Sequence, residues 1–142
     1  MVIITGQCHC GNIDYQLRWP TPAHALRGRA CGCGYCQRQG AVWTSDPNAH
    51  LDVIIKQAAQ VSHYHFGHST ATFHLCAICG IVPFASSESG HHLAAVTNIN
   101  TFTSLEPRAV QHEPSDFEGE TSQARLARRR RNWTPLRISA AQ

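Results

Sequence analysis

Three cysteines lie within six residues of this chain, in the stretch CGCGYC at residues 31–36. The other four form two more tight groups, CHCG at residues 8–11 and CAICG at residues 76–80. Cysteines two or three residues apart on a tight turn can direct their sulfurs at one ion, and thiolates are strong ligands of Zn²⁺. The spacing therefore indicates metal binding.

Two other interpretations of the cysteines are weaker. A disulfide framework is disfavoured because seven is an odd number, no export signal is visible, and a bridge within C-x-C would be strained. Isolated cysteines often serve as small buried hydrophobic residues. Here all seven fall in clusters, which favours metal over simple packing.

The cysteines divide into a set of four, which closes a tetrahedral site, and a set of three, which leaves one position open. A closed site is structural, whereas three protein ligands and one open position are the arrangement of a catalytic zinc. Another partition, in which His9 or a cysteine moves between the sites, remains possible. We expect two Zn²⁺ ions per chain, a structural one at Cys8, Cys10, Cys76 and Cys79 and an open, catalytic one at Cys31, Cys33 and Cys36.

The order of these motifs resembles that of the glutathione-dependent formaldehyde-activating enzymes, a family whose domain is shared with centromere protein V. The similar elements are C-x-C-G at residues 8–11, C-x-C-x-x-C at 31–36 and C-x-x-C-G at 76–80. The likeness covers roughly residues 5–120, and it includes VTNIN at 96–100 and FEG at 117–119.

The resemblance implies an all-β fold of antiparallel sheets in a β-tent (Mss4-like) architecture, stapled by zinc. It also implies the same division of zinc ligands and a carbon–sulfur lyase chemistry, in which glutathione adds to formaldehyde. We therefore expect an enzyme whose partners are a small thiol and a small aldehyde. An alternative is a non-catalytic zinc-binding interaction module that associates with nucleic acid through a basic tail.

No residue is assigned as the catalytic acid or base. The ten histidines are candidates for supplying a proton to a developing alkoxide, but none has a spacing that singles it out. Three aromatic residues near the cysteines in sequence or pattern are candidates for a pocket wall: Tyr35, Trp43 and Phe73.

Charge is unevenly distributed along the chain. Six of the twelve Lys and Arg residues and all nine Asp and Glu residues lie in residues 1–124, which gives this part a net charge of −3. The remaining six basic residues are all arginines, four of them in a row at 128–131. Clustered arginines bind phosphates, but no element for reading a nucleic-acid groove is evident, so we do not expect nucleic acid as a partner. We expect a domain over residues 1–119 and a looser, Arg-rich extension over 120–142.

The pattern of apolar residues predicts short strands as the elements that position the cysteines. Residues 13–19 place an apolar side chain at every second position, the pattern of a half-buried strand. Further strands are expected at 51–55, 61–66, 70–75, 81–85 and 93–99, with a turn at 86–90. There is no run of about 18 apolar residues and no basic, apolar leader, so a cytoplasmic location is expected.

Overall fold

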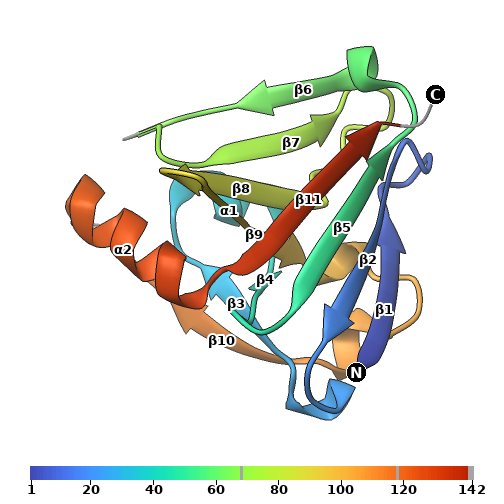
Figure 1. The fold of residues 1–142 in the computed structure, drawn as a ribbon, viewed down its shortest axis with the longest axis horizontal. Helices are drawn as coiled ribbons and strands as arrows, with labels where there is room; N and C mark the ends of the chain where they lie inside the picture. The colour runs from blue at the N-terminus through green and yellow to red at the C-terminus, as the bar shows by residue number, and fades with distance from the viewer. Residues whose placement is uncertain (68, 118, 141–142) are drawn as a thin grey trace.

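The computed structural model of this chain describes residues 1–67, 69–117 and 119–140. Strands make up 45% and helices 20% of it, and its strands join in one open sheet that does not close on itself (Figure 1). The helices are α1 (Gly34–Gln39) and α2 (Ser122–Asn132), with single 3₁₀ turns at Ala23–Ala25, Ala58–Gln60, Ile99–Thr101 and Pro107–Ala109. The strands are β1 (Val2–Gln7), β2 (Ile13–Trp19), β3 (Arg27–Cys31), β4 (Trp43–Thr44), β5 (His50–Ile55), β6 (Val61–Tyr64), β7 (Thr72–Cys76), β8 (Phe84–Ser89), β9 (His92–Asn98), β10 (Gln111–Ser115) and β11 (Thr134–Ala140).

The first part of the sheet contains β1, β2, β5 and β11 in that order. The alternation predicted for residues 13–19 is confirmed, because the side chains at 13, 15, 17 and 19 are all buried. They pack with residues of β5 into the main hydrophobic core. Tyr15 is held there by a hydrogen bond between its hydroxyl and that of Thr101, at 2.8 Å.

The second part of the sheet carries the cysteine-rich turns. Here β6, β7, β8 and β9 pair in antiparallel order, and β9 continues through β4 and β3 to β10. A smaller core lies on this part and includes Trp43, Phe73, Val82 and Trp133. The predicted all-β class with antiparallel sheets is confirmed, with two parallel pairs that the sequence did not indicate, β3 with β10 and β5 with β11.

Strand β8 differs from the prediction at both ends. A strand at 81–85 and a turn at 86–90 were expected, but β8 begins at Phe84 and continues to Ser89. The serines stay in the strand because their hydroxyls have partners: Ser86 bonds to His74 Nε2 and Ser87 donates to the Thr70 carbonyl, each at 2.8 Å. The turn follows at Gly90, whose φ of 62° favours glycine.

Residues 122–140 form helix α2 and a strand of the sheet, so the expectation of a looser tail is wrong for these residues. Strand β11 pairs in parallel with β5, with Leu136 opposite Leu51, and antiparallel with β9 at Thr134 and Pro135. Between these strands, α2 begins at Thr121, whose hydroxyl accepts from the Ala124 amide at 3.1 Å. The boundary at residue 119 stays a prediction.

Both helices are short. In the described part of the chain, neither combines the length and the apolar composition that crossing a membrane requires.

Replacing Trp133 with Ala is expected to lower the free energy of unfolding by about 3–5 kcal/mol. The ring is buried in the smaller core at the start of β11, so its loss leaves a cavity where α2 and β11 meet the sheet. Urea unfolding followed by circular dichroism measures the change. Ile138→Ala, on the more exposed part of β11, is the control, and equal stability of the two variants would mean that this segment contributes nothing to the fold.

Candidate metal centres and the adjoining cavity

Two glycine turns bring the first four cysteines together. Cys8 directly follows β1, and Cys76 ends β7. Each turn closes through a glycine amide, since Gly11 donates to the Cys8 carbonyl at 3.1 Å and Gly80 to the Cys76 carbonyl at 2.8 Å. Both glycines have φ near +85°, a conformation that a side chain would strain.

The four sulfurs lie at the separations that one tetrahedral ion requires. Cys10 Sγ is 3.7 Å from Cys8 Sγ and 3.5 Å from Cys76 Sγ, and all four sulfurs lie within 4.8 Å of one another. Sulfurs on a tetrahedral zinc would be about 3.8 Å apart, given Zn–S bonds near 2.3 Å. Cys8 and Cys76 are completely buried. The predicted set Cys8, Cys10, Cys76 and Cys79 is thus assembled as one cluster that fits a metal ion.

Burial also explains why this cluster calls for a cation. Desolvation raises the pKa of the Cys8 thiol to about 12, although the Ile13 amide donates to its sulfur at 3.3 Å. A thiolate at this position therefore needs a compensating positive charge, and a cation shared by four sulfurs provides one.

The other three cysteines surround the junction of β3 and α1. Cys31 is the last residue of β3, Cys33 is the N-cap of α1, and Cys36 lies in the first turn of that helix. The Cys36 amide donates to Cys33 Sγ at 3.4 Å, which satisfies one of the free amides of the helix start. Helix α1 ends after one and a half turns at Gly40, which adopts a left-handed conformation.

The sulfurs of Cys31, Cys33 and Cys36, hereafter the cysteine trio, also lie within 4.8 Å of one another. A hydrogen bond from Cys36 lowers the pKa of Cys31 to about 5, and the same bond, together with burial, raises the pKa of Cys36. The indole of Trp43 donates to Cys36 Sγ at 3.4 Å. The trio thus already favours negative charge at one sulfur, and its donor set suits a thiophilic cation.

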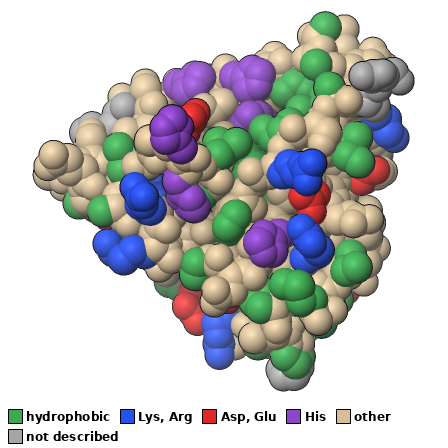
Figure 2. Space-filling model, in the orientation of Figure 1, with side chains coloured by type: hydrophobic (Ala, Val, Ile, Leu, Met, Phe, Trp, Pro, Cys, Tyr) green, Lys and Arg blue, Asp and Glu red, His purple; other side chains and the backbone are tan. Residues whose placement is uncertain are grey.

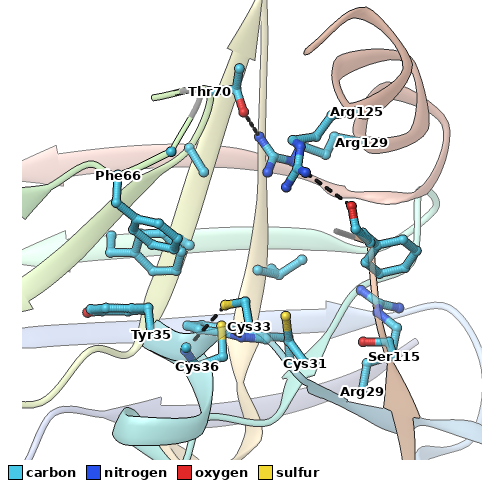
Figure 3. A pocket seen from close by; sticks show the side chains of 18 of the residues that line it. Arg29, Cys31, Cys33, Tyr35, Cys36, Phe66, Thr70, Ser115, Arg125 and Arg129 are labelled. Carbon is cyan, nitrogen blue, oxygen red and sulfur yellow. Dashed lines mark hydrogen bonds between the residues drawn. The ribbon is translucent and has the colours of Figure 1, made fainter. Parts of the chain in front are cut away.

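A cavity of about 640 Å³ adjoins the cysteine trio. Its volume is in the range of small-molecule sites, and the trio lies on its floor (Figure 3). The predicted wall residues Tyr35, Trp43 and Phe73 all line it. Tyr64 and Phe66 complete this wall, with ring centroids 5.1 and 5.2 Å from that of Tyr35. The sequence placed Tyr64 and Phe66 only on a strand face.

The histidines contribute little to the cavity. None of the described residues that line it is a histidine. His63 and His65 are exposed on and beside β6, and Figure 2 shows histidine side chains gathered on the surface over this region. His74 is buried away from the trio, where its ring stacks on Phe84 at 4.2 Å and burial lowers its pKa to about 4.

Arginine side chains line the cavity instead, and sequence reasoning missed them. Two come from the β3–α1 region and three from helix α2: Arg29, Arg38, Arg125, Arg128 and Arg129. The spacing of Arg125, Arg128 and Arg129 could have indicated a shared position, because residues at i, i+3 and i+4 lie on one face of a helix.

A family profile matches the chain over most of its length. The profile of the glutathione-dependent formaldehyde-activating enzymes matches residues 3–117. The chain belongs to this family. The resemblance inferred from the cysteine motifs is thereby confirmed. The matched region contains all seven cysteines, whereas α2 and β11 lie beyond it.

One solved structure supports the fold. A crystal structure of a Rhodobacter sphaeroides protein is similar to this chain with a TM-score of 0.57 and 24% sequence identity, covering 77% of this chain and 99% of that one. At this identity the likeness shows the fold alone. No curated protein matches the chain.

The two clusters are expected to differ in their effect on stability. Cys79→Ser removes a ligand that helps to join β1 to β7, so the melting temperature should fall by about 10 °C or more. Cys33→Ser alters a local turn and should leave a cooperatively folded protein. Cys33 and Cys79 are similarly half-buried, so the two variants are matched in burial. Thermal melts followed by circular dichroism measure the melting temperature of each. If Cys33→Ser has as low a melting temperature as Cys79→Ser, the two clusters contribute equally to the stability of the fold, which would contradict the prediction.

Proposed function

We propose that the protein is a zinc-dependent enzyme that catalyses the reversible addition of a small thiol to a small aldehyde, a carbon–sulfur lyase type of reaction. The observation that carries the proposal is the position of the cysteine trio, which is a three-ligand cluster on the floor of a cavity large enough for a small molecule. The family to which the chain belongs is named for glutathione and formaldehyde, and we propose these, or close analogues, as the substrates.

Both clusters are proposed to hold zinc. The donors are all cysteine sulfurs, and two separations in the four-cysteine cluster, 3.7 and 3.5 Å, are close to those of tetrahedral coordination. We assign the closed set Cys8, Cys10, Cys76 and Cys79 to a structural ion and the trio to an ion with an open position. When bound at the trio, zinc would supply Lewis acidity that lowers the pKa of a substrate thiol.

The chain's own residues would bind and orient the reactants. The aromatic wall offers apolar surface beside the trio. In the net reaction, the thiol sulfur forms a bond to the carbonyl carbon and the C=O π electrons move to oxygen. The proton lost by the thiol ends on that oxygen, so no oxidant or reductant is needed. Holding both reactants in one cavity accelerates such a step by proximity.

The cysteines support a proposal about the compartment. All seven are unpaired, and thiolate metal ligands persist where thiols are kept reduced. We therefore propose that the protein functions in the cytoplasm.

Purified protein is expected to contain two zinc ions per chain, measured by inductively coupled plasma mass spectrometry. Cys33→Ser should retain one ion, because it leaves the four-cysteine cluster intact. A protein that contains iron with an iron–sulfur absorbance, or wild type and Cys33→Ser with equal zinc, would contradict the assignment.

Wild-type protein should accelerate exchange between free and hydroxymethylated glutathione in mixtures with formaldehyde, and Cys33→Ser should not. Exchange spectroscopy by NMR measures the rate at equilibrium. The uncatalysed reaction is appreciable, so buffer alone and Cys33→Ser at equal concentration are the controls. Equal rates in all three samples, across several thiols, would leave the alternative of a non-catalytic zinc-binding module.

A further inference from the structure

Helix α2 directs three of its arginines into the cavity. Arg125, Arg128 and Arg129 line it, whereas Arg130 and Arg131 on the same helix are exposed. Figure 3 shows Arg125 and Arg129 on the opposite side of the cavity from the cysteine trio. A ligand in the cavity would therefore meet sulfur ligands at one end and guanidinium groups at the other.

Arg129 is the most enclosed of these side chains. It is only 8% exposed, its Nη1 donates to the Thr70 hydroxyl at 2.7 Å, and its guanidinium lies 4.8 Å from the centre of the Trp133 ring. Its Nε is buried and has no hydrogen-bond partner among the described residues. A buried guanidinium without a counter-charge is costly, so Arg129 favours an anion at the part of its side chain that lines the cavity.

Positive charge exceeds negative charge among the described residues of α2 and the loop before it. Glu120 forms a two-pronged ion pair with Arg128, with Nε–Oε2 and Nη2–Oε1 distances of 3.0 Å. Arg125 is 4.0 Å from the same carboxylate, and its Nη2 donates instead to the Phe117 carbonyl at 3.1 Å. Among the residues that the structure describes, the Glu120 carboxylate thus faces three guanidinium groups.

The negative charge that the lining favours lies at the cysteine trio, on the opposite side of the cavity from Arg129. Arg29 also lines the cavity, and none of the described lining residues is acidic. Burial, followed by repulsion from Arg128 and Arg125, lowers the pKa of Arg129 to about 10, so this residue is still charged at neutral pH. A positive cluster beside an apolar wall attracts an anion more strongly than the same charges in water would.

We propose that this face of α2 binds the carboxylate of the thiol substrate, with Arg129 as the main contact and Arg125 beside it. The inference rests on the proposed function and specifies where in the cavity the carboxylate of the thiol binds and which residues of α2 recognise it. A carboxylate accepts charge-assisted hydrogen bonds from guanidinium groups, and it would supply the negative charge that Arg129 and Arg125 lack on the cavity side. The segment that selects the substrate then lies outside the matched residues 3–117.

The test uses two thiols that differ only in the carboxylate, N-acetylcysteine and N-acetylcysteine amide. Isothermal titration calorimetry on the purified, metal-containing protein gives the dissociation constant of each. Wild type should bind the acid about tenfold more tightly or better. Arg129→Gln should reduce this ratio to near one, and Arg130→Gln should keep it.

The two variants are matched, since both remove one positive charge from the same helix. Because Arg129 packs on Trp133, circular dichroism checks the fold of Arg129→Gln. Arg125→Gln, at a less buried position, carries the test if Arg129→Gln does not fold, and it should also lower the ratio.

Three results would overturn the proposal: equal affinity of wild type for acid and amide, equal loss of the preference in Arg130→Gln, or tighter binding of inorganic phosphate than of N-acetylcysteine. Displacement of N-acetylcysteine by a single-stranded oligonucleotide would also overturn it, because the arginines would then serve nucleic acid.

A thiol-free pair separates this inference from the catalytic proposal. N-acetyl-S-methylcysteine and its amide retain the carboxylate contrast without a free thiol. An Arg129-dependent preference for this acid, without faster thiol–aldehyde exchange, would uphold the carboxylate site and refute the catalytic proposal. Faster exchange without any carboxylate preference would refute only the carboxylate site.

Discussion

The contact between the sulfurs of Cys10 and Cys76, 3.5 Å apart, joins two strands that do not pair with each other. Strand β1 pairs with β2, and β7 pairs with β6 and β8. Four sulfur atoms, two of them completely buried, meet at this point and repel one another when ionised. A cation held by all four sulfurs would turn this repulsion into a cross-link between the two parts of the sheet. The loop between Cys10 and Cys76 is long, but the entropic cost of closing a loop rises only slowly with its length.

The walls of the cavity come from distant parts of the chain. The junction of β3 and α1 supplies the cysteine trio, the β6–β7 hairpin supplies Tyr64, Phe66 and Phe73, and α2 supplies arginines. No single segment encloses the space. The trio alone is a local motif, but a cavity beside it exists only when the sheet brings the hairpin and α2 against it.

The sequence predicted the parts of the structure that are specified locally. The strands at 13–19 and 51–55 could be predicted because burial follows every second residue. The cysteine clusters could be grouped because ligand spacing reflects turn geometry, and both groups are found together in space. Strands β3 and β10 lack such a pattern: β3 is RGRAC and β10 is QHEPS, and each is held mainly by pairing with the other.

The orientation of α2 could not be predicted for a different reason. A run of arginines usually indicates a solvated surface, and composition does not reveal which residues face inward. The direction of α2 is set by long-range contacts, through the burial of Trp133 and the docking of β11 between β5 and β9. Without those contacts, Arg129 and Arg130 are equivalent in sequence, yet one is buried and the other is exposed.

The late position of β11 in the chain has a consequence for biosynthesis. In the described residues, β5 pairs with β2 on one side and with β11 on the other, and Leu51 finds its partner Leu136 only after every other described strand has been made. A growing chain on the ribosome therefore carries β5 with an open edge while the rest of the sheet folds. Unpaired edges recruit strands from other molecules. The nascent protein is accordingly most prone to misassociation just before β11 emerges, and docking of that strand ends this exposure.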